Sequence, residues 1–305
     1  MSAATLIRPC AIWHNGALGD LLISFPSMNL LKNAFGDISI FIARGEAGRF
    51  VGRLLGAGSF LSADSPDLIS IFSGHVPRPL NGIGRVVLFT NRPQGDLASA
   101  LSTLFEDTLH VINTSPGGKG RYGHSLYEQQ YAQARSLTGE YGDMMEHLPG
   151  RNKKEPGDYW VLHPGSGGME KNWPVARFKA LIKGVRRVFP AFGVRVIIGP
   201  AEGKRAGEIA ALLEMDGVGG IIGAPLEMVF EILGGAVCYV GNDSGISHLA
   251  ALARTRSFII FGPTDPATWA PPFPWVQVIA KREPGPVDAI QVNAVLARVL
   301  KTISR

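Results

Sequence analysis

Four segments of the sequence place glycine next to charged or hydroxyl side chains, and each follows a short run of apolar residues. They are the segments 15–20, 163–174, 241–248 and 261–266. Glycine and the first turn of a helix expose backbone N–H groups to an anion, and a lysine adds a positive charge. These residue types predict binding of a phosphorylated ligand. A carboxylate among them could serve as a general base.

Asp20 ends the first segment, and Pro26 follows it in the same expected helix. The helix dipole stabilises a carboxylate in the first turn, so Asp20 could simply begin the helix. It could also face a cleft as a general base. Gly16 and Gly19 form G-x-x-G rather than the G-x-G-x-x-G of dinucleotide-binding folds. Arg44 stands where those folds carry an acid and suits a 2′-phosphate, so an NADP-binding alternative stays open.

The second segment reads His-Pro-Gly-Ser-Gly-Gly-Met-Glu-Lys-Asn-Trp-Pro. Ser166 and Gly167 are small and leave backbone N–H groups accessible to a phosphate, and Lys171 can place a positive charge on a diphosphate. The sequence contains no Walker A loop, G-x-x-x-x-G-K-[ST]. The alternative is an ordinary loop between a strand and a helix, with Lys171 in solvent.

The third segment combines an acid, a hydroxyl, a glycine and a histidine at the start of a helix. Ser244 and Gly245 supply N–H groups that have no partner within a helix, which predicts an anion site between Asp243 and His248. His248 lies one helical turn after Ser244 and can share its face. A histidine in this place could alternatively be a hydrogen-bonded core residue.

Three further side chains lie at expected strand ends. Glu202 opens a helix and could accept hydrogen bonds from two ribose hydroxyls, or it could serve only the helix dipole. Thr264 and Asp265 lie in a proline-rich loop, where they could contact donor phosphate or sugar, or only form a turn.

Strands are expected to alternate with helices, which predicts parallel sheets. Strands are predicted at 10–14, 38–43, 85–90, 108–112, 159–163, 194–198, 219–222, 237–240 and 257–261, and helices at 21–34, 175–189, 203–215, 226–233, 247–253 and 287–303. The polar, Pro- and Gly-containing stretch 148–158 separates two doubly wound α/β domains, 1–150 and 151–305. The sequence does not decide whether the helix at 287–303 crosses back onto the first domain. Every segment above follows the carboxyl end of a strand, where such sheets bind ligands.

Composition narrows the class of protein. The 305 residues are 46% hydrophobic and 18% charged, which excludes a disordered chain. The net charge of +5 favours anionic partners, but no run of like charges indicates nucleic-acid binding. The two cysteines, Cys10 and Cys238, lie in apolar runs, as is typical of a reducing cytoplasm. No signal peptide or spanning helix is expected.

Taken together, the segments resemble those of glycosyltransferase family 9, the ADP-heptose:lipopolysaccharide heptosyltransferases. The shared motifs are G-D-x₅-P, P-G-x₅-K-x-W-P, D-S-G-x-x-H and F-G-P-T-D-P, which stand here at 19–26, 164–174, 243–248 and 261–266. The stretch His-Ser-Leu-Tyr-Glu-Gln-Gln-Tyr at 124–131 is similar to the helix that precedes the linker in that family. The resemblance implies a GT-B fold, in which two Rossmann-like domains face a central cleft.

The resemblance also implies an inverting transfer of heptose from a nucleotide-sugar donor, ADP-heptose, to a hydroxyl of a lipopolysaccharide-core-like or other glycan acceptor. The first domain would bind the acceptor and the second the donor. Asp20 and Lys171 would be catalytic. The donor would be held by Gly19, Ser166, Gly167, Lys171, Glu202, Asp243, Ser244, Gly245, His248, Thr264 and Asp265. The segment 166–168 is smaller than the hydroxyl-paired version in some members, so phosphate contacts from side chains there are not implied.

No cofactor is expected, and no metal, because the sequence lacks an Asp-x-Asp motif. The expected location is the cytoplasm, with the inner face of the membrane as a hypothesis that the net positive charge supports. Alternatives are a nucleotide-sugar epimerase of the same fold, an NADP-dependent oxidoreductase, and a catalytically silent binding module. The last is disfavoured because Asp20, Lys171 and the segment 243–248 all carry chemistry.

Overall fold

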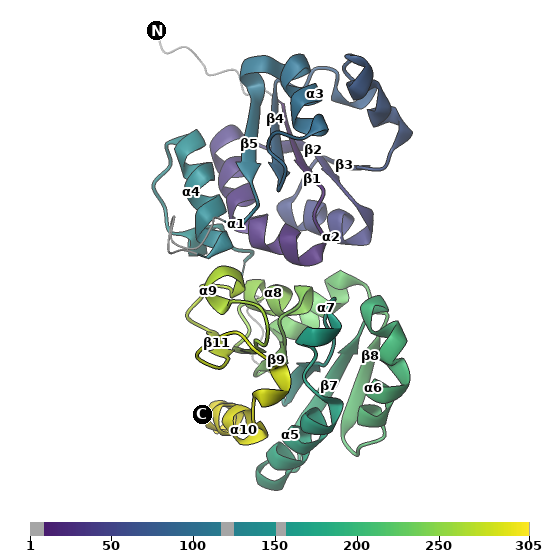
Figure 1. Ribbon diagram of the computed structural model, residues 1–305, viewed down its shortest axis with the longest axis vertical. Helices are drawn as coiled ribbons and strands as arrows, with labels where there is room; N and C mark the ends of the chain where they lie inside the picture. Colours follow the sequence, from purple (N-terminus) through teal and green to yellow (C-terminus); the bar gives the residue numbers. More distant parts are fainter. Residues whose placement is uncertain (1–8, 117–124, 151–156, 305) are drawn as a thin grey trace. The chain divides into compact units, whose positions relative to one another are not determined.

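A computed structural model describes residues 9–116, 125–150 and 157–304. The contacts within the chain divide it into two compact units, Met1–Leu148 and Pro149–Arg305. Each unit contains one parallel β-sheet with helices on its faces (Figure 1). Within the described residues, no helix combines the length and the hydrophobicity that crossing a membrane requires.

The sheet of the N-terminal unit has five strands in the order β3-β2-β1-β4-β5. The central strand β1 is buried along its whole length because it pairs in parallel with a neighbour on each side. The strands are β1 (Cys10–His14), β2 (Ile38–Ala43), β3 (Ser59–Ser62), β4 (Arg85–Thr90) and β5 (Leu109–Asn113).

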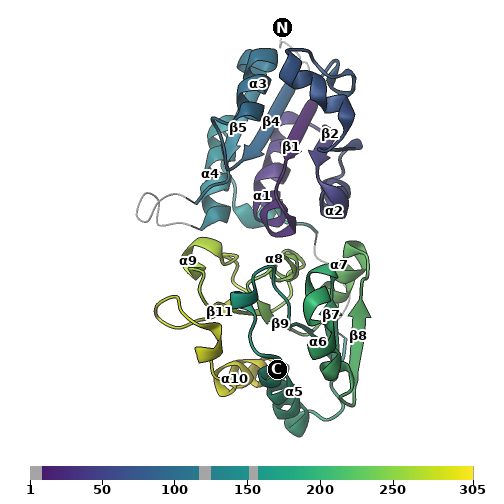
Figure 2. The same ribbon diagram turned by 45° about the vertical axis from the view of Figure 1, so that its right-hand side comes forward.

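In the described residues of this unit, four α-helices pack around the sheet. Helices α1 and α4 pack side by side against one face, as both ribbon views show (Figure 2). The helices are α1 (Leu18–Phe35), α2 (Gly45–Leu55), α3 (Asp96–Phe105) and α4 (Leu126–Thr138), with short 3₁₀ helices η1 (Pro66–Ser73), η2 (Arg78–Leu80), η3 (Glu106–Thr108) and η4 (Met144–His147). Helix α1 contains an unbroken run of buried residues from Leu21 to Met28.

The sheet of the C-terminal unit has six strands in the order β11-β10-β9-β6-β7-β8. Two strands run outward from each side of the central pair β9 and β6, which is the order of a dinucleotide-binding fold. The strands are β6 (Tyr159–His163), β7 (Gly193–Ile198), β8 (Val218–Ile222), β9 (Tyr239–Asn242), β10 (Ser257–Ile260) and β11 (Val276–Ile279).

The helices of this unit cover both faces of the sheet. They are α5 (Val175–Val188), α6 (Ala206–Leu213), α7 (Leu226–Gly234), α8 (Gly245–Leu252), α9 (Pro266–Trp269) and α10 (Val292–Ile303), with 3₁₀ helices η5 (Met169–Lys171), η6 (Pro200–Arg205) and η7 (Val287–Ala289). Helix α10 packs on α5, and its Val295 and Val299 are buried in the core of the C-terminal unit. The apolar face of α10 therefore packs on the C-terminal unit itself.

The predicted strands are present, and the parallel sheets follow from them. The edge strands β3 and β11 were not predicted, because neither carries a continuous apolar run. The last helix begins at Val292 rather than at 287. Residues before it form the 3₁₀ turn η7, in which Val287 faces the core.

Candidate functional site

The loops that carry the predicted donor residues, Gly19 excepted, follow four neighbouring strands of the C-terminal sheet. In the order β10-β9-β6-β7 these strands run parallel, so their carboxyl ends lie at one edge. The strand order reverses between β9 and β6, which is where doubly wound sheets open a crevice for a ligand. The sequence predicted these loops because each follows a buried apolar run.

Asp243 joins three of these loops. Its Oδ2 accepts hydrogen bonds from Lys171 Nζ at 2.8 Å and from Thr264 Oγ1 at 2.7 Å. Its backbone oxygen accepts one from Ser166 Oγ at 2.7 Å. The structure thus brings together four of the predicted donor residues. Lys171 stays about a quarter exposed, with 27% of its side chain accessible, so its ammonium group can reach a ligand.

Asn242 fixes the loop after β6, although the sequence did not single it out. The side chain is fully buried; its Nδ2 donates to Pro164 O at 2.9 Å, and its Oδ1 accepts the N–H of Trp173 at 3.1 Å. Arg205 Nη1 donates to the same Pro164 oxygen at 3.1 Å. A polar residue in the last position of an apolar strand was the signal that could have marked Asn242.

The amino end of α8 lies directly beyond β9. Ser244 is its N-cap and Gly245 its first residue, so the N–H groups of these two residues precede every acceptor of the helix, whereas the N–H of Ser247 donates to Ser244 O at 3.0 Å. Ser247 ties this turn to the strand, because its hydroxyl donates to Asn242 O and is 2.9 Å from the hydroxyl of Tyr239. The arrangement fits an anion bound at a helix amino end beside Lys171.

His248 is 4% exposed and lies inside the cluster. Burial lowers its pKa to about 4; Asp243 opposes this shift and Lys171 adds to it. The imidazole is therefore neutral at pH 7. His248 thus carries no positive charge beside the ammonium group of Lys171.

Glu202 lies in η6 and is buried at the carboxyl ends of β6 and β7. Its Oε2 accepts the Gly199 N–H at 2.6 Å, and its Oε1 lies 3.6 Å from His163 Nε2. A Cβ on Gly165 would lie 1.7 Å from Oε1, so the carboxylate packs directly on that glycine. With 2% of the side chain exposed, the carboxylate faces the protein, and its role toward a ribose stays a prediction.

Asp265 has a structural role in the loop after β10. Its Oδ1 accepts the N–H of Ala267 at 3.0 Å, and its Oδ2 accepts the hydroxyl of Thr268 at 3.1 Å. The carboxylate therefore caps the short helix α9. Contact of Asp265 with a donor stays a prediction, and so does that of Gly167, which is exposed with open space around its Cα.

Gly19 and Asp20 lie in the N-terminal unit, in the first turn of α1 beyond the carboxyl end of β1. Asp20 is exposed, and its Oδ2 accepts the N–H of Ala17 at 3.0 Å. The carboxylate thus begins the helix and is also accessible to a substrate. Arg44, on which the NADP alternative depends, forms an exposed ion pair with Asp64 at 3.1 Å.

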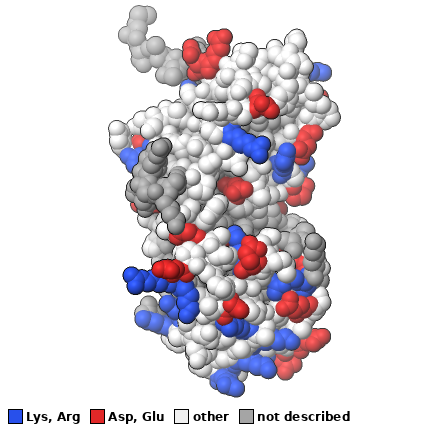
Figure 3. Space-filling model, viewed as in Figure 1, with Lys and Arg blue, Asp and Glu red and all other residues white. Residues whose placement is uncertain are grey.

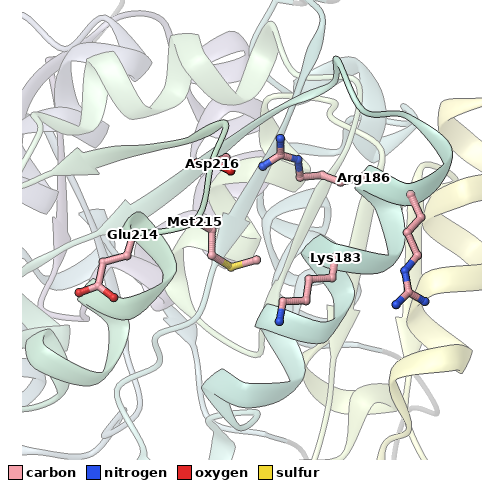
Figure 4. A pocket seen from close by; sticks show the side chains of 6 residues that line it. Lys183, Arg186, Glu214, Met215 and Asp216 are labelled. Atoms are coloured by element: carbon pink, nitrogen blue, oxygen red, sulfur yellow. The ribbon is translucent and has the colours of Figure 1, made fainter.

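A pocket of about 490 Å³ lies away from these loops. It is formed by Lys183, Arg186 and Arg187 near the end of α5 and by the turn before β8, residues 214–216 (Figure 4). That turn precedes the amino end of β8, so the pocket lies at the opposite edge of the sheet from Asp243. In the parts of the chain that the structure describes, no three His, Cys, Asp or Glu side chains gather to hold a metal ion. The expectation that no cation is required stays a prediction.

Comparison with known proteins agrees with the motifs. The family model "Glycosyltransferase family 9 (heptosyltransferase)" matches residues 109–286. Lipopolysaccharide heptosyltransferase 1 of Pseudomonas aeruginosa is 32% identical over 157 residues, which cover 50% of this chain and 42% of that protein. The chain thus matches less than half the length of this curated relative.

Two solved structures are similar along nearly the whole chain. The structure of E. coli ADP-heptose lps heptosyltransferase II has a TM-score of 0.74 at 15% identity and covers 97% of this chain and 98% of its own. E. coli heptosyltransferase WaaC with ADP-2-deoxy-2-fluoro heptose has a TM-score of 0.68 at 19% identity, and the match covers 96% of this chain and 99% of that chain. The predicted α/β class with two parallel sheets, as in GT-B enzymes, is confirmed. Since the family model spans more than half of the 305 residues, the resemblance is confirmed as well, and the chain belongs to glycosyltransferase family 9.

Proposed function

We propose that the protein is a glycosyltransferase that moves a heptose from ADP-heptose to a hydroxyl of a lipopolysaccharide-core-like glycan, with inversion at the anomeric carbon. The observation that carries the proposal is the convergence of Ser166, Lys171 and Thr264 on Asp243, at the crevice edge of the C-terminal sheet. The family membership and a similar structure that holds an ADP-heptose analogue support this donor. The identity of the acceptor rests on the family alone.

The reaction is a single displacement. Asp20 takes the proton from the acceptor hydroxyl, and the oxygen attacks the anomeric carbon of the heptose. The bond between that carbon and the diphosphate oxygen breaks, and ADP leaves with the electron pair. A positioned general base contributes about 10²–10⁴ in rate.

The charge that develops on the departing diphosphate needs donors already in place. Lys171 supplies an ammonium group, and the first turn of α8 supplies the N–H groups of Ser244 and Gly245. Asp243 holds Lys171 at 2.8 Å, so the ammonium group is oriented before the donor arrives. Each such preorganised donor is worth roughly 3–4 kcal/mol in the transition state.

The alternatives are less well supported. An epimerase of the same fold would consume donor without an acceptor, and neither the family nor the curated relative carries that activity in its description. An NADP-dependent oxidoreductase would need Arg44 for the 2′-phosphate, and its guanidinium is paired with Asp64.

Calorimetric titration with ADP, UDP, GDP and NADPH tests the donor class. We expect ADP to bind most tightly. Transfer of heptose from ADP-heptose to a deacylated lipopolysaccharide core is then measured with the wild type and with Asp20→Asn. The variant should retain ADP affinity and lose about 10²–10⁴ of kcat. Tighter binding of UDP or NADPH would contradict the donor, and near-normal turnover of the variant would remove Asp20 as the base.

We also propose that the protein works in the cytoplasm and visits an anionic membrane, where a glycolipid acceptor would lie. The supporting observation is the surface of α5 and α10. Neither Val175–Val188 nor Val292–Ile303 contains an acidic residue. Figure 3 shows basic side chains on the viewed face of the C-terminal unit, with acidic side chains among them. The basic residues of the two helices are Arg177, Lys179, Lys183, Arg186, Arg187, Arg298 and Lys301.

Each exposed basic residue near an anionic surface contributes about 1 kcal/mol to binding. The double variant Lys183→Glu with Arg187→Glu should therefore lose more than tenfold in affinity for vesicles that contain phosphatidylglycerol, while ADP affinity is retained. Replacement of the exposed Arg53 and Arg78 in the N-terminal unit is the matched control. Equal binding of the wild type to neutral and anionic vesicles would contradict the membrane proposal.

A further inference from the structure

His14 lies at the carboxyl end of β1 and is 2% exposed, yet it has no role in the chemistry proposed above. Its Nδ1 accepts the N–H of Gly16 at 2.9 Å. Because a backbone N–H can only donate, Nδ1 carries no proton, and in the neutral ring the proton is on Nε2. Burial lowers the pKa of His14 to about 3, which agrees with a neutral ring.

The other side of the ring is fixed by two helices. Nε2 lies 2.9 Å from Ser24 Oγ on α1. The Ser24 hydroxyl lies 2.6 Å from Gln130 Oε1 on α4 and 3.0 Å from the backbone oxygen of Asp20, and it can donate to either. Phe89 of β4 stacks on the ring, with 5.5 Å between centroids. The plane and the tautomer of His14 are thus set by its neighbours.

The residues that follow His14, Gly16 and Ala17, contact the Asp20 side chain directly. A Cβ on Gly16 would lie 2.6 Å from His14 Cε1 and 2.5 Å from Asp20 Cβ, so the imidazole and the Asp20 side chain both press on this glycine. The next N–H, that of Ala17, donates to Asp20 Oδ2 at 3.0 Å. A displacement of the ring must therefore displace the turn that directs the carboxylate.

The geometry points to His14 as a positioning residue for Asp20, held by Ser24 and Gln130 and acting through the Gly16–Ala17 turn. This inference rests on the proposed role of Asp20 as general base. It also gives a function to part of the segment 124–131, in which Gln130 would fix α4 to the base-bearing helix.

Two substitutions separate the hydrogen bond from the packing. His14→Phe keeps a ring that can stack on Phe89 but offers no acceptor to Gly16. His14→Asn places an amide oxygen close to the position of Nδ1 and restores the acceptor. Ser24→Ala is a smaller change that removes the partner of Nε2 and provides a test if the ring variants fold poorly.

We expect His14→Phe to lower kcat about 10²-fold with little change in the KM for the donor, because small misplacements of a catalytic group are costly. His14→Asn should recover most of that loss, and Ser24→Ala should lower kcat about tenfold. ADP affinity, measured by calorimetry, should stay within twofold of the wild type in all three. Hydrogen exchange of the Gly16 amide should be faster in His14→Phe and slow again in His14→Asn.

His147→Phe is the matched control. His147 is a buried histidine of the same unit, and its Nδ1 lies 3.2 Å from Asn33 Nδ2 on α1. This variant should lose stability without losing kcat. A wild type that transfers no heptose would contradict the proposed function. Wild-type kcat in His14→Phe, or unchanged exchange at Gly16, would contradict the positioning role, and so would an equal loss of kcat in His147→Phe.

Discussion

At the scale of single residues, the group formed by Ser166, Lys171, Asp243 and Thr264 depends on one buried carboxylate, which holds a partly exposed lysine. Asp243 is 5% exposed, and its Oδ2 is shared by Lys171 and Thr264. Desolvation of a buried ion pair costs free energy, and the hydrogen bonds of the pair roughly offset that cost, so its net contribution to stability is small. The pair does fix the direction of the ammonium group. The pair is therefore better understood as an orienting device than as a source of stability.

Lys171→Ala tests this role. The variant should lower kcat about 10²-fold and weaken ADP binding about tenfold, because it removes one charged donor to the diphosphate. Lys179→Ala, which removes a partly exposed lysine from α5, is the control and should be neutral. Steady-state kinetics and calorimetry give both values. If Lys171→Ala kept wild-type kcat and ADP affinity, Lys171 would have no part in donor binding.

His248 predicts a pH dependence of stability. Its pKa is about 4 in the folded protein, against about 6.5 in an unfolded chain, so the unfolded state binds a proton between these values and the folded state does not. Stability should be fully present above pH 6.5 and should fall toward pH 4, by up to about 3 kcal/mol from this residue. Below pH 4 this residue causes no further loss.

Urea unfolding at pH 7.5, 6 and 5 measures this loss. His248→Gln should make the dependence less steep, whereas His75→Gln, at an exposed position, should leave it unchanged. His14, whose pKa burial lowers to about 3, acts in the same direction in the N-terminal unit. A dependence equally steep in His248→Gln and the wild type would exclude His248 as a source of the acid sensitivity.

At the scale of elements, most of the predicted strands carry apolar runs, and every strand inside the two sheets was predicted; of the four edge strands, β5 and β8 were predicted and β3 and β11 were not. β1 reads Cys-Ala-Ile-Trp-His and is buried throughout, whereas the edge strand β3 reads Ser-Phe-Leu-Ser and carries no such signal. The loops of the site were predictable for the same reason, since glycine and charge follow each buried run.

The partners inside the site were not predictable. Asn242 and Arg205 both donate hydrogen bonds to the backbone oxygen of Pro164. Contacts with backbone groups that are distant in the sequence leave no pattern in the types of side chain. Likewise, the sequence placed Glu202 at a strand end, but its carboxylate is directed by the Gly199 N–H and packs on Gly165, which follows the neighbouring strand. Such orientations depend on which strands become neighbours.

The loop between β6 and α5 gives a prediction at this scale. Gly165→Ala would place a Cβ 1.7 Å from Glu202 Oε1, so the loop or the carboxylate must move. We expect a loss of about 1–3 kcal/mol in the free energy of unfolding, together with weaker ADP binding. Gly167→Ala, with no atom within 4 Å of the new Cβ, should leave the free energy of unfolding nearly unchanged.

Urea unfolding and calorimetry distinguish the two glycine variants. Because Gly165 and Glu202 touch, the cost of Gly165→Ala should shrink in a Glu202→Ala background. An equal cost in both backgrounds would show that contact with Glu202 is not what excludes a side chain at Gly165.

At the scale of the whole molecule, the two units have separate hydrophobic cores, each built on its own sheet. The residues proposed for ADP lie in the C-terminal unit, and the proposed base lies in the N-terminal one. A nucleotide that binds only the folded C-terminal unit should stabilise that unit, by about 2.7 kcal/mol at a concentration 100 times its Kd.

Hydrogen exchange with and without ADP measures where this stabilisation falls. Exchange should slow in the loop 163–173 and in the first turn of α8, and the turn before Asp20 should keep its rate with ADP alone. ADP-heptose should add protection at Gly19 and Asp20, because only the intact donor presents the sugar to the base. UDP at the same concentration is the control and should protect neither region. Protection by ADP confined to the N-terminal unit would contradict the donor site, since it would place the nucleotide on a sheet whose strand ends carry none of the residues that converge on Asp243.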